Sequence, residues 1–164
     1  MKLIIINGVM GVGKSVTSKA LNQLLDKSIW LDGDWCWMMD PFIVNDITKE
    51  MVIDNITYQL NNFIKSKQFK HIIFNWVIDE ESIYESIIKN LEPVKIYKIT
   101  LMCSKTTLTN RINQDIAAKL RDDSNLERSL AKYEKYQNLN SIKIDTDDKD
   151  IDIICKEIKA ILED

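Results

Sequence analysis

A glycine-rich bend lies between an apolar run and a region of helical spacing in residues 3–21, LIIINGVMGVGKSVTSKAL. Residues 8–15 match the pattern G-x-x-x-x-G-K-S/T at every defined position. The glycines let the backbone curl until successive N–H groups point at one anion, and the start of the next helix adds partial positive charge. A buried strand before the bend and a helix after it are the context that such a phosphate-binding loop requires. We therefore expect the chain to bind a nucleoside triphosphate with Mg²⁺; the alternative is a glycine turn that only precedes a helix.

Individual residues of this loop have different expected roles. The Lys14 ammonium reaches the β- and γ-phosphates, and the Ser15 hydroxyl binds Mg²⁺. The predicted nucleotide-binding residues of the loop are consecutive: Gly8, Val9, Met10, Gly11, Val12, Gly13, Lys14, Ser15 and Val16.

Short apolar runs and helical patterns alternate along the rest of the chain. Apolar, β-branched runs at residues 3–6, 28–31, 71–77, 94–101 and 141–144 are typical of strands buried on both faces of a parallel sheet. Apolar residues at helical spacing occur in residues 16–24, 56–64, 83–91, 108–116 and 151–161. Right-handed crossovers then place helices on both faces of the sheet. The prediction is an α/β protein, a single three-layer α/β/α domain over residues 1–164 with a five-stranded parallel sheet.

Composition narrows the function classes. With 22 basic and 25 acidic residues the formal charge is -3, which favours neither nucleic acid nor an anionic membrane as a partner. Three dispersed cysteines and one histidine predict neither a disulfide framework nor a zinc site. No stretch has the length of a signal peptide or a membrane span. We expect a cytoplasmic protein, monomeric or weakly dimeric.

Two carboxylates follow the second predicted strand, in the sequence WLDGDWCWMMDPF. On an extended segment, Asp32 and Asp34 at a spacing of two point the same way. The carboxyl end of a parallel strand is where ligands bind in open sheets. The alternative is an Asp-Gly turn that caps the next element.

Strings that select guanine in GTPases are missing from the sequence, and its length leaves no room for the added subdomains of ring-forming ATPases. The phosphate-binding loop and the Asp-x-Asp element together resemble the small P-loop kinases of the nucleoside monophosphate kinase fold, such as shikimate kinase, gluconate kinase and adenylylsulfate kinase. The resemblance implies ATP- and Mg²⁺-dependent transfer of a phosphoryl group to a hydroxyl or phosphate of a small molecule. It assigns Asp32, with Ser15, to the metal and Asp34 to the acceptor. The alternative function is a nucleotide-binding regulatory protein that transfers no group or hydrolyses slowly.

The three arginines of the chain, Arg111, Arg121 and Arg128, all lie within one short region. Phosphoryl-transfer sites use the planar, always-charged guanidinium. In the resembling kinases this region is a lid whose arginines close over the phosphates, which implies a helical lid at about residues 105–128 and a catalytic role for the arginines beside Lys14 and Asp34. The alternative is a set of surface ion pairs, such as Arg111 with Asp115.

Two further regions follow from the resemblance. It implies an acceptor-binding region at about residues 33–70, and it places Asp145 and Thr146 at the edge of an adenine pocket. Nucleoside monophosphate kinases end their third strand with Asp-Gly-Phe-Pro-Arg, whereas this chain has HIIFNWVIDEES, which leaves open whether Asn75 or Asp79 shares in supporting the metal. A candidate acceptor wall, with ordinary core packing as the alternative, consists of Trp35, Trp37, Met38, Met39, Phe42 and Trp76.

Overall fold

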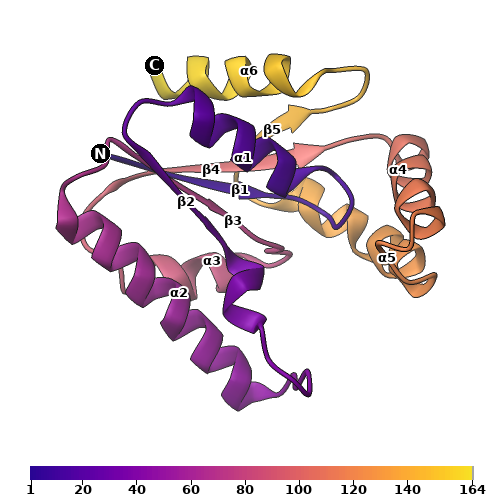
Figure 1. Ribbon diagram of the computed structural model, residues 1–164, viewed down its shortest axis with the longest axis horizontal. Coiled ribbons are helices and arrows are strands. Elements are labelled where there is room, and N and C mark those ends of the chain that lie inside the picture. Colours follow the sequence, from indigo (N-terminus) through magenta and orange to yellow (C-terminus); the bar gives the residue numbers. More distant parts are fainter. Residues whose placement is uncertain (164) are drawn as a thin grey trace.

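A five-stranded parallel sheet with the strand order β2-β3-β1-β4-β5 forms the centre of the computed structural model, which describes residues 1–163 (Figure 1). All five predicted strands are confirmed, although the third ends two residues earlier than predicted. The strands are β1 (Lys2–Asn7), β2 (Ser28–Asp32), β3 (His71–Asn75), β4 (Lys95–Met102) and β5 (Ile142–Asp145).

Helices cover both faces of the sheet, which confirms the predicted three-layer α/β/α architecture. In Figure 1, α1 and α6 lie together on one face, while α2, α3 and α5 lie on the other. Helix α4 lies beyond the carboxyl ends of the strands. The helices are α1 (Lys14–Leu24), the short 3-10 helix η1 (Gly33–Trp37), α2 (Asp46–Ser66), α3 (Glu81–Ile88), α4 (Lys105–Ala117), α5 (Ser124–Asn138) and α6 (Ile151–Glu163).

Strand β1 is the centre of the core because it pairs with β3 on one side and β4 on the other. Its residues Leu3, Ile4, Ile5 and Ile6 are all inaccessible to solvent. The strand ends at the buried Asn7, whose side chain donates to the Ile78 carbonyl at 2.7 Å and accepts from the Ile78 amide at 2.8 Å. This pair of hydrogen bonds holds the segment that follows β3 against the end of β1.

The predicted helix at residues 16–24 is confirmed, but the face that its apolar spacing suggested is not the buried one. Val16 and Leu24 are 60% and 45% exposed. The buried residues of α1 are Thr17, Ser18 and Leu21. Small side chains on that face allow close approach of α6, whose Cys155 thiol lies 3.7 Å from the Thr17 carbonyl.

Helix α5 was not predicted from apolar spacing, because the side chains that it buries are largely polar. They are Ser129, Tyr133 and Tyr136. The Tyr133 hydroxyl donates to the Cys103 carbonyl at 2.8 Å, which fixes α5 to the end of β4. The predicted lid region therefore comprises α4, a short connection and the first turn of α5.

All three cysteines are free thiols, and Cys103 and Cys155 are buried. No helix within residues 1–163 combines the length and the apolar character needed to cross a membrane.

Replacing a β1 core side chain tests this description of the core. Ile4→Ala removes a fully buried side chain from the central strand, and we expect the free energy of unfolding to fall by about 2–5 kcal/mol in urea denaturation. The matched control is Ile47→Ala on α2, where the side chain is 78% exposed and the expected change is within about 0.5 kcal/mol. Equal losses for the two variants would contradict this core.

Candidate active site

The phosphate-binding loop connects β1 to α1 and needs glycine at specific positions. Gly8, Gly11 and Gly13 all have positive φ angles, which side chains disfavour. A Cβ atom at Gly8 would lie 2.7 Å from the Leu101 carbonyl oxygen, and one at Gly11 would lie 2.7 Å from the Ile112 side chain. The loop can therefore curl tightly against β4 and α4. Gly13 is the N-cap of α1, and the first N–H groups of that helix have no partner within the helix.

Lys14 lies at the first position of α1, and its ammonium donates to the Val9 carbonyl at 3.1 Å. Burial lowers the pKa of Lys14 to about 8, although the nearby carboxylates of Asp34 and Asp32 oppose that shift. The negative charge of a bound polyphosphate would stabilise the protonated form of Lys14 and so raise its pKa.

Asp32 ends β2 and is 6% exposed. Its Oδ2 atom accepts hydrogen bonds from the Ser15 hydroxyl at 2.8 Å and from the Asn75 side-chain amide at 2.9 Å. Its Oδ1 atom accepts from the Asp34 backbone N–H at 3.0 Å and so caps η1. Asp32 therefore both caps the following element, as the turn alternative held, and contacts the serine of the phosphate-binding loop.

Asn75 ends β3, next to Asp32 in the sheet. Its side-chain oxygen accepts from the Trp30 indole N–H at 2.5 Å, which orients the amide toward Asp32. Of the two residues left open as supports for the metal side, Asn75 is thus the one bonded to Asp32.

The prediction that Asp34 lies on an extended segment is wrong, because the chain turns into η1 immediately after Asp32. The turn depends on Gly33, where a Cβ atom would lie 2.5 Å from the Trp76 ring. Asp34 still lies near Asp32 and Lys14. Burial raises the pKa of Asp34, Asp32 adds to the rise, and Lys14 opposes it.

A cavity of about 380 Å³ lies over the phosphate-binding loop. We call it the phosphate cavity. It brings together many of the predicted site residues, and Val77, Gln114 and Asp115, which the sequence did not indicate, also line it. The predicted residues that line it are Met10, Gly11, Gly13, Lys14, Ser15, Val16, Asp34, Arg111 and Arg121.

Arg111 extends from α4 and joins two segments of the site. Its guanidinium donates to the Val12 carbonyl at 3.2 Å, to the Thr146 hydroxyl at 3.0 Å and to the Thr146 carbonyl at 3.0 Å. The alternative pairing with Asp115 is wrong, because Asp115 is paired with Arg121 at 2.7 Å. Arg111 thus ties the phosphate-binding loop to the segment after β5, where the adenine pocket was expected.

The remaining predicted residues lie outside the phosphate cavity. Arg128 is exposed on α5 and lines a separate cavity of about 120 Å³, together with Val9 and Met10. Asp145 lines another cavity, of about 520 Å³, beside Cys103. Thr146 is buried and held by Arg111.

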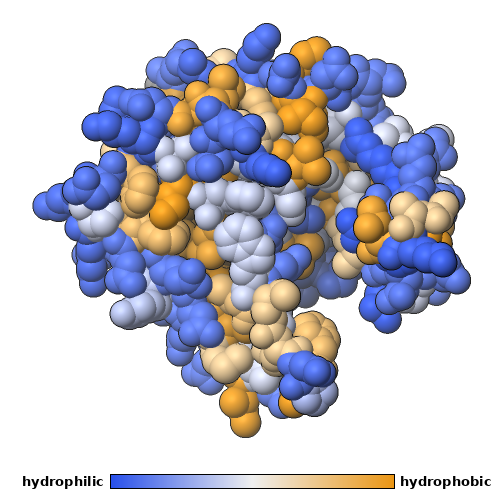
Figure 2. All heavy atoms as spheres, in the orientation of Figure 1, coloured by the Kyte–Doolittle hydropathy of each residue, from blue (hydrophilic) through white to orange (hydrophobic). Residues whose placement is uncertain are grey.

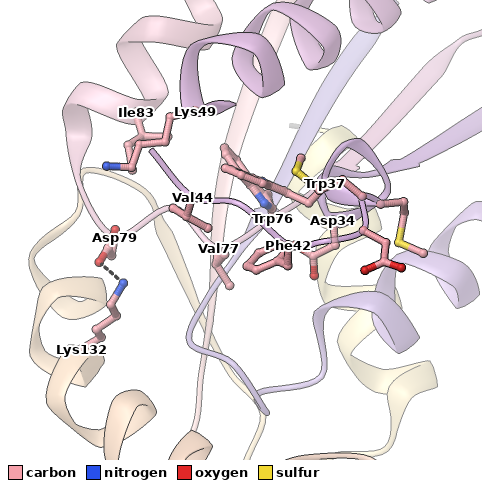
Figure 3. A pocket seen from close by; sticks show the side chains of 13 residues that line it. Asp34, Trp37, Phe42, Val44, Lys49, Trp76, Val77, Asp79, Ile83 and Lys132 are labelled. Atoms are coloured by element: carbon pink, nitrogen blue, oxygen red, sulfur yellow. Dashed lines mark ion pairs between the residues drawn. The ribbon is translucent and has the colours of Figure 1, made fainter. Parts of the chain in front are cut away.

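A larger cavity, of about 1000 Å³, lies on the other side of Asp34. We call it the acceptor cavity. Figure 3 shows Asp34 at one end and the pair formed by Asp79 and Lys132 at the other, with Phe42 and Trp76 between them. Only residues 34–49 of the predicted acceptor region contribute to it. Its lining is Asp34, Trp37, Met38, Met39, Asp40, Phe42, Val44, Lys49, Trp76, Val77, Asp79, Ile83 and Lys132.

Trp35 is the one member of the predicted wall that does not line this cavity. It is 52% exposed and packs against Trp30 with ring centroids 5.0 Å apart. Trp76 was predicted as part of the wall, and Asp79 only as a possible support for the metal. The sequence did not indicate Val77, Ile83 or Lys132 as lining residues, because no local pattern connects residue 79 with residue 132.

Asp79 is held by cations of α5. Its carboxylate lies 2.9 Å from the Lys132 ammonium and 3.6 Å from that of Lys135. Burial alone would raise the pKa of Asp79, but the hydrogen bond and charge of Lys132 and the charge of Lys135 outweigh it and hold the pKa below its usual range. Asp79 is therefore a charged anchor between the β3–α3 connection and α5.

A protein-family model described as an AAA domain matches residues 4–132, which is most of the chain. The chain therefore belongs to the AAA domain family. The match runs from β1 through most of α5 and so includes the phosphate-binding loop, η1 and α4 of this AAA domain. A search of curated protein sequences gave no significant match.

Solved structures show the same fold as this AAA domain. The tunicamycin resistance protein of Deinococcus radiodurans is 17% identical, with a TM-score of 0.72 over 98% of this chain and 95% of that chain. A gluconokinase from Sinorhizobium meliloti is 17% identical, with a TM-score of 0.71 over 97% and 90%. Shikimate kinase from Acinetobacter baumannii, in complex with shikimate, is 16% identical, with a TM-score of 0.65 over 98% and 92%. The fold is thus that of the small P-loop kinases.

The lowered pKa of Lys14 predicts proton uptake when a nucleotide binds. With a pKa of about 8, the Lys14 side chain of the nucleotide-free protein is about half protonated at pH 8, and bound phosphates raise that pKa. Binding of Mg²⁺-ATP should then take up about half a proton at pH 8, more at pH 9 and little at pH 7. Calorimetry in buffers of different ionisation enthalpy measures this uptake.

The matched variant for this test is Lys19→Met, which removes an exposed lysine from the same helix and should leave the uptake unchanged. Nucleotide binding without proton uptake at pH 9 would contradict the assignment of Lys14 to the phosphates.

Proposed function

We propose that the protein is an ATP- and Mg²⁺-dependent kinase that transfers the γ-phosphoryl group to a hydroxyl of a small molecule. The observation that carries this proposal is the position of Asp34, which lines both the phosphate cavity and the acceptor cavity. A carboxylate at the junction of a donor site and an acceptor site is placed to orient the attacking hydroxyl.

On the donor side, the backbone N–H groups of residues 8–15 and the Lys14 ammonium hold the phosphates. The Arg111 hydrogen bonds fix the segment around Thr146 relative to that loop. The adenine base of ATP would lie against this segment. Arg121 lines the phosphate cavity and would supply positive charge to the transferring group once phosphate oxygens replace its partner Asp115, 2.7 Å away, while Arg128 lies farther away on α5.

The donor set also fits Mg²⁺. No cluster of three or more acidic, histidine or cysteine side chains suited to a metal occurs in the described residues, but P-loop sites use a hydroxyl and a carboxylate together with phosphate oxygens and water. The Ser15 hydroxyl and the Asp32 carboxylate, in contact at 2.8 Å, provide these oxygens. When bound, Mg²⁺ neutralises charge on the β- and γ-phosphate oxygens.

In the proposed transfer, the acceptor oxygen forms a bond to the γ-phosphorus, and the bond between that phosphorus and the β–γ bridging oxygen breaks to release ADP. The hydroxyl proton passes to Asp34. Its pKa, raised by burial and by Asp32, makes the carboxylate a better proton acceptor than an ordinary aspartate. Lys14 and Arg121 balance the negative charge around the phosphoryl group.

The fold shared with a gluconokinase and a shikimate kinase supports phosphoryl transfer as the chemistry. A nucleotide-binding regulatory protein would also use the phosphate-binding loop. It would need neither the acceptor cavity nor the carboxylate that connects this cavity to the phosphates, which favours the kinase.

Asp34→Asn tests the proposal, because the amide keeps the size of the side chain and loses the proton acceptor. We expect kcat to fall by about 10²–10⁴-fold with the nucleotide Kd within about twofold of wild type. ADP formation is followed with Mg²⁺-ATP and a panel of nucleosides, sugars, hydroxy acids and hydroxylated antibiotics. Asp54→Asn, an exposed aspartate on α2 outside both cavities, is the control.

Other outcomes distinguish the alternatives. Acceptor-dependent ADP formation that survives in Asp34→Asn would overturn the role of Asp34. Tight ATP binding without acceptor-dependent turnover would favour the regulatory protein, and ADP formation that needs no acceptor would indicate a hydrolase. Lys14→Ala should lower turnover by orders of magnitude in each case that involves group transfer.

A further inference from the structure

The acceptor cavity has a size that excludes the smallest acceptors as its natural occupants. Its volume of about 1000 Å³ is at the upper end of the range, about 300–1000 Å³, in which drug-sized ligands are bound. A ligand that contacts Asp34 at one end and the segment near Asp79 at the other must span the cavity shown in Figure 3. A single small sugar or hydroxy acid would leave most of the walls without contacts.

The walls are apolar and aromatic. Trp37 and Phe42 lie with ring centroids 5.8 Å apart, and the Trp76 ring faces the same space (Figure 3). Met38 and Phe42 are strongly exposed, at 84% and 67%. Figure 2 shows apolar side chains gathered on the projecting part of the molecule below the sheet, over the connection between η1 and α2. This aromatic and thioether surface is in contact with water in the free protein. An apolar face of a ligand would displace that water, which favours binding.

The charges around the cavity are the second observation. Of its two cations, Lys132 pairs with the largely buried Asp79 at 2.9 Å, whereas Lys49 makes only a solvent-exposed contact of 3.5 Å with Asp46. Among residues 1–163, the other two acids of the lining, Asp34 and Asp40, form no ion pair, and no arginine lines the cavity.

Phosphate and carboxylate groups are commonly held by the bidentate fork of arginine. All three arginines of this chain lie elsewhere, one of them bonded to Thr146 and one to Asp115. An anionic acceptor would therefore meet two unpaired carboxylates and no free guanidinium, and such like-charge contacts oppose binding.

We propose that the acceptor is a drug-sized alcohol, neutral or cationic, whose planar or apolar face packs against the aromatic wall and whose hydroxyl reaches Asp34. A cationic group would be attracted by Asp40 and by the faces of the aromatic rings. This inference rests on the proposed kinase function, and it excludes nucleoside monophosphates and simple hydroxy acids as preferred acceptors.

Matched pairs of ligands test the proposal. Each pair consists of a neutral alcohol and its anionic derivative, for example nucleosides with their 5′-monophosphates and hydroxylated aromatic amides with the corresponding carboxylates. Binding is measured by tryptophan fluorescence, because Trp37 and Trp76 line the cavity, with Mg²⁺ and a non-hydrolysable ATP analogue present. We expect the neutral member to bind at least about tenfold more tightly.

A charge reversal in the cavity provides the matched variants. Asp40→Lys adds a free cation to the lining and should shift the ratio of the two Kd values by about tenfold toward the anionic member. Asp54→Lys changes the net charge equally, on an exposed face of α2, and should leave the ratio unchanged. An unchanged ratio in Asp40→Lys, tighter binding of the anionic members to wild type, or no binding of neutral or cationic members at millimolar concentration would each overturn the proposal.

Binding and turnover separate this inference from the kinase function itself. If several neutral alcohols bind in the cavity but none yields ADP with Mg²⁺-ATP, the kinase is refuted and the ligand class remains supported. Efficient phosphorylation of an anionic acceptor would establish the kinase and refute the ligand class.

Discussion

One buried carboxylate, that of Asp32, joins the parts of the site. It accepts hydrogen bonds from Ser15 at the start of α1, from Asn75 at the end of β3 and from the backbone of Asp34 in η1. A buried carboxylate is stable only when its oxygens are satisfied, so the three donors and the acid determine one another's positions. Asp32, at the end of the edge strand β2, thereby fixes the position of Ser15 and the direction in which the chain continues after β2. Because the chain turns there, Asp34 lies where the phosphate cavity and the acceptor cavity meet.

The acceptor side is assembled in the same way, from polar contacts that cross between segments. Asn7 binds both backbone groups of Ile78, and Asp79, one residue later, is paired with Lys132 of α5. Buried polar groups that are fully paired select one arrangement, since any other leaves them unsatisfied. The aromatic walls can therefore stay open to solvent without collapse, because the backbone around them is held by these contacts and by the close packing of Trp76 on Gly33.

Features that depend on residues close together in the sequence were predicted, and features that depend on contacts between distant residues were missed. The five strands and the phosphate-binding loop carry local patterns of apolar runs, glycines and a Lys-Ser pair, and their positions were predicted well. The conformation at Asp34 was not, because it depends on the contact of Gly33 with a tryptophan far along the chain. The partner of Arg111 was likewise missed, since Thr146 is remote in sequence and the nearer Asp115 is taken by Arg121.

Electrostatics couple the two cavities in the proposed reaction. In the free protein, the positive charge of Lys14 lowers the pKa of Asp34 while the burial of Lys14 lowers its own. Bound phosphates would pair with the Lys14 ammonium, and their own negative charge beside Asp34 would raise the pKa of that carboxyl. The carboxylate would then accept the hydroxyl proton most readily when the phosphoryl donor is in place. Asp34 would therefore be a stronger base when ATP is bound. The acceptor hydroxyl would lose its proton mainly in the complex that also holds ATP, where phosphoryl transfer can follow.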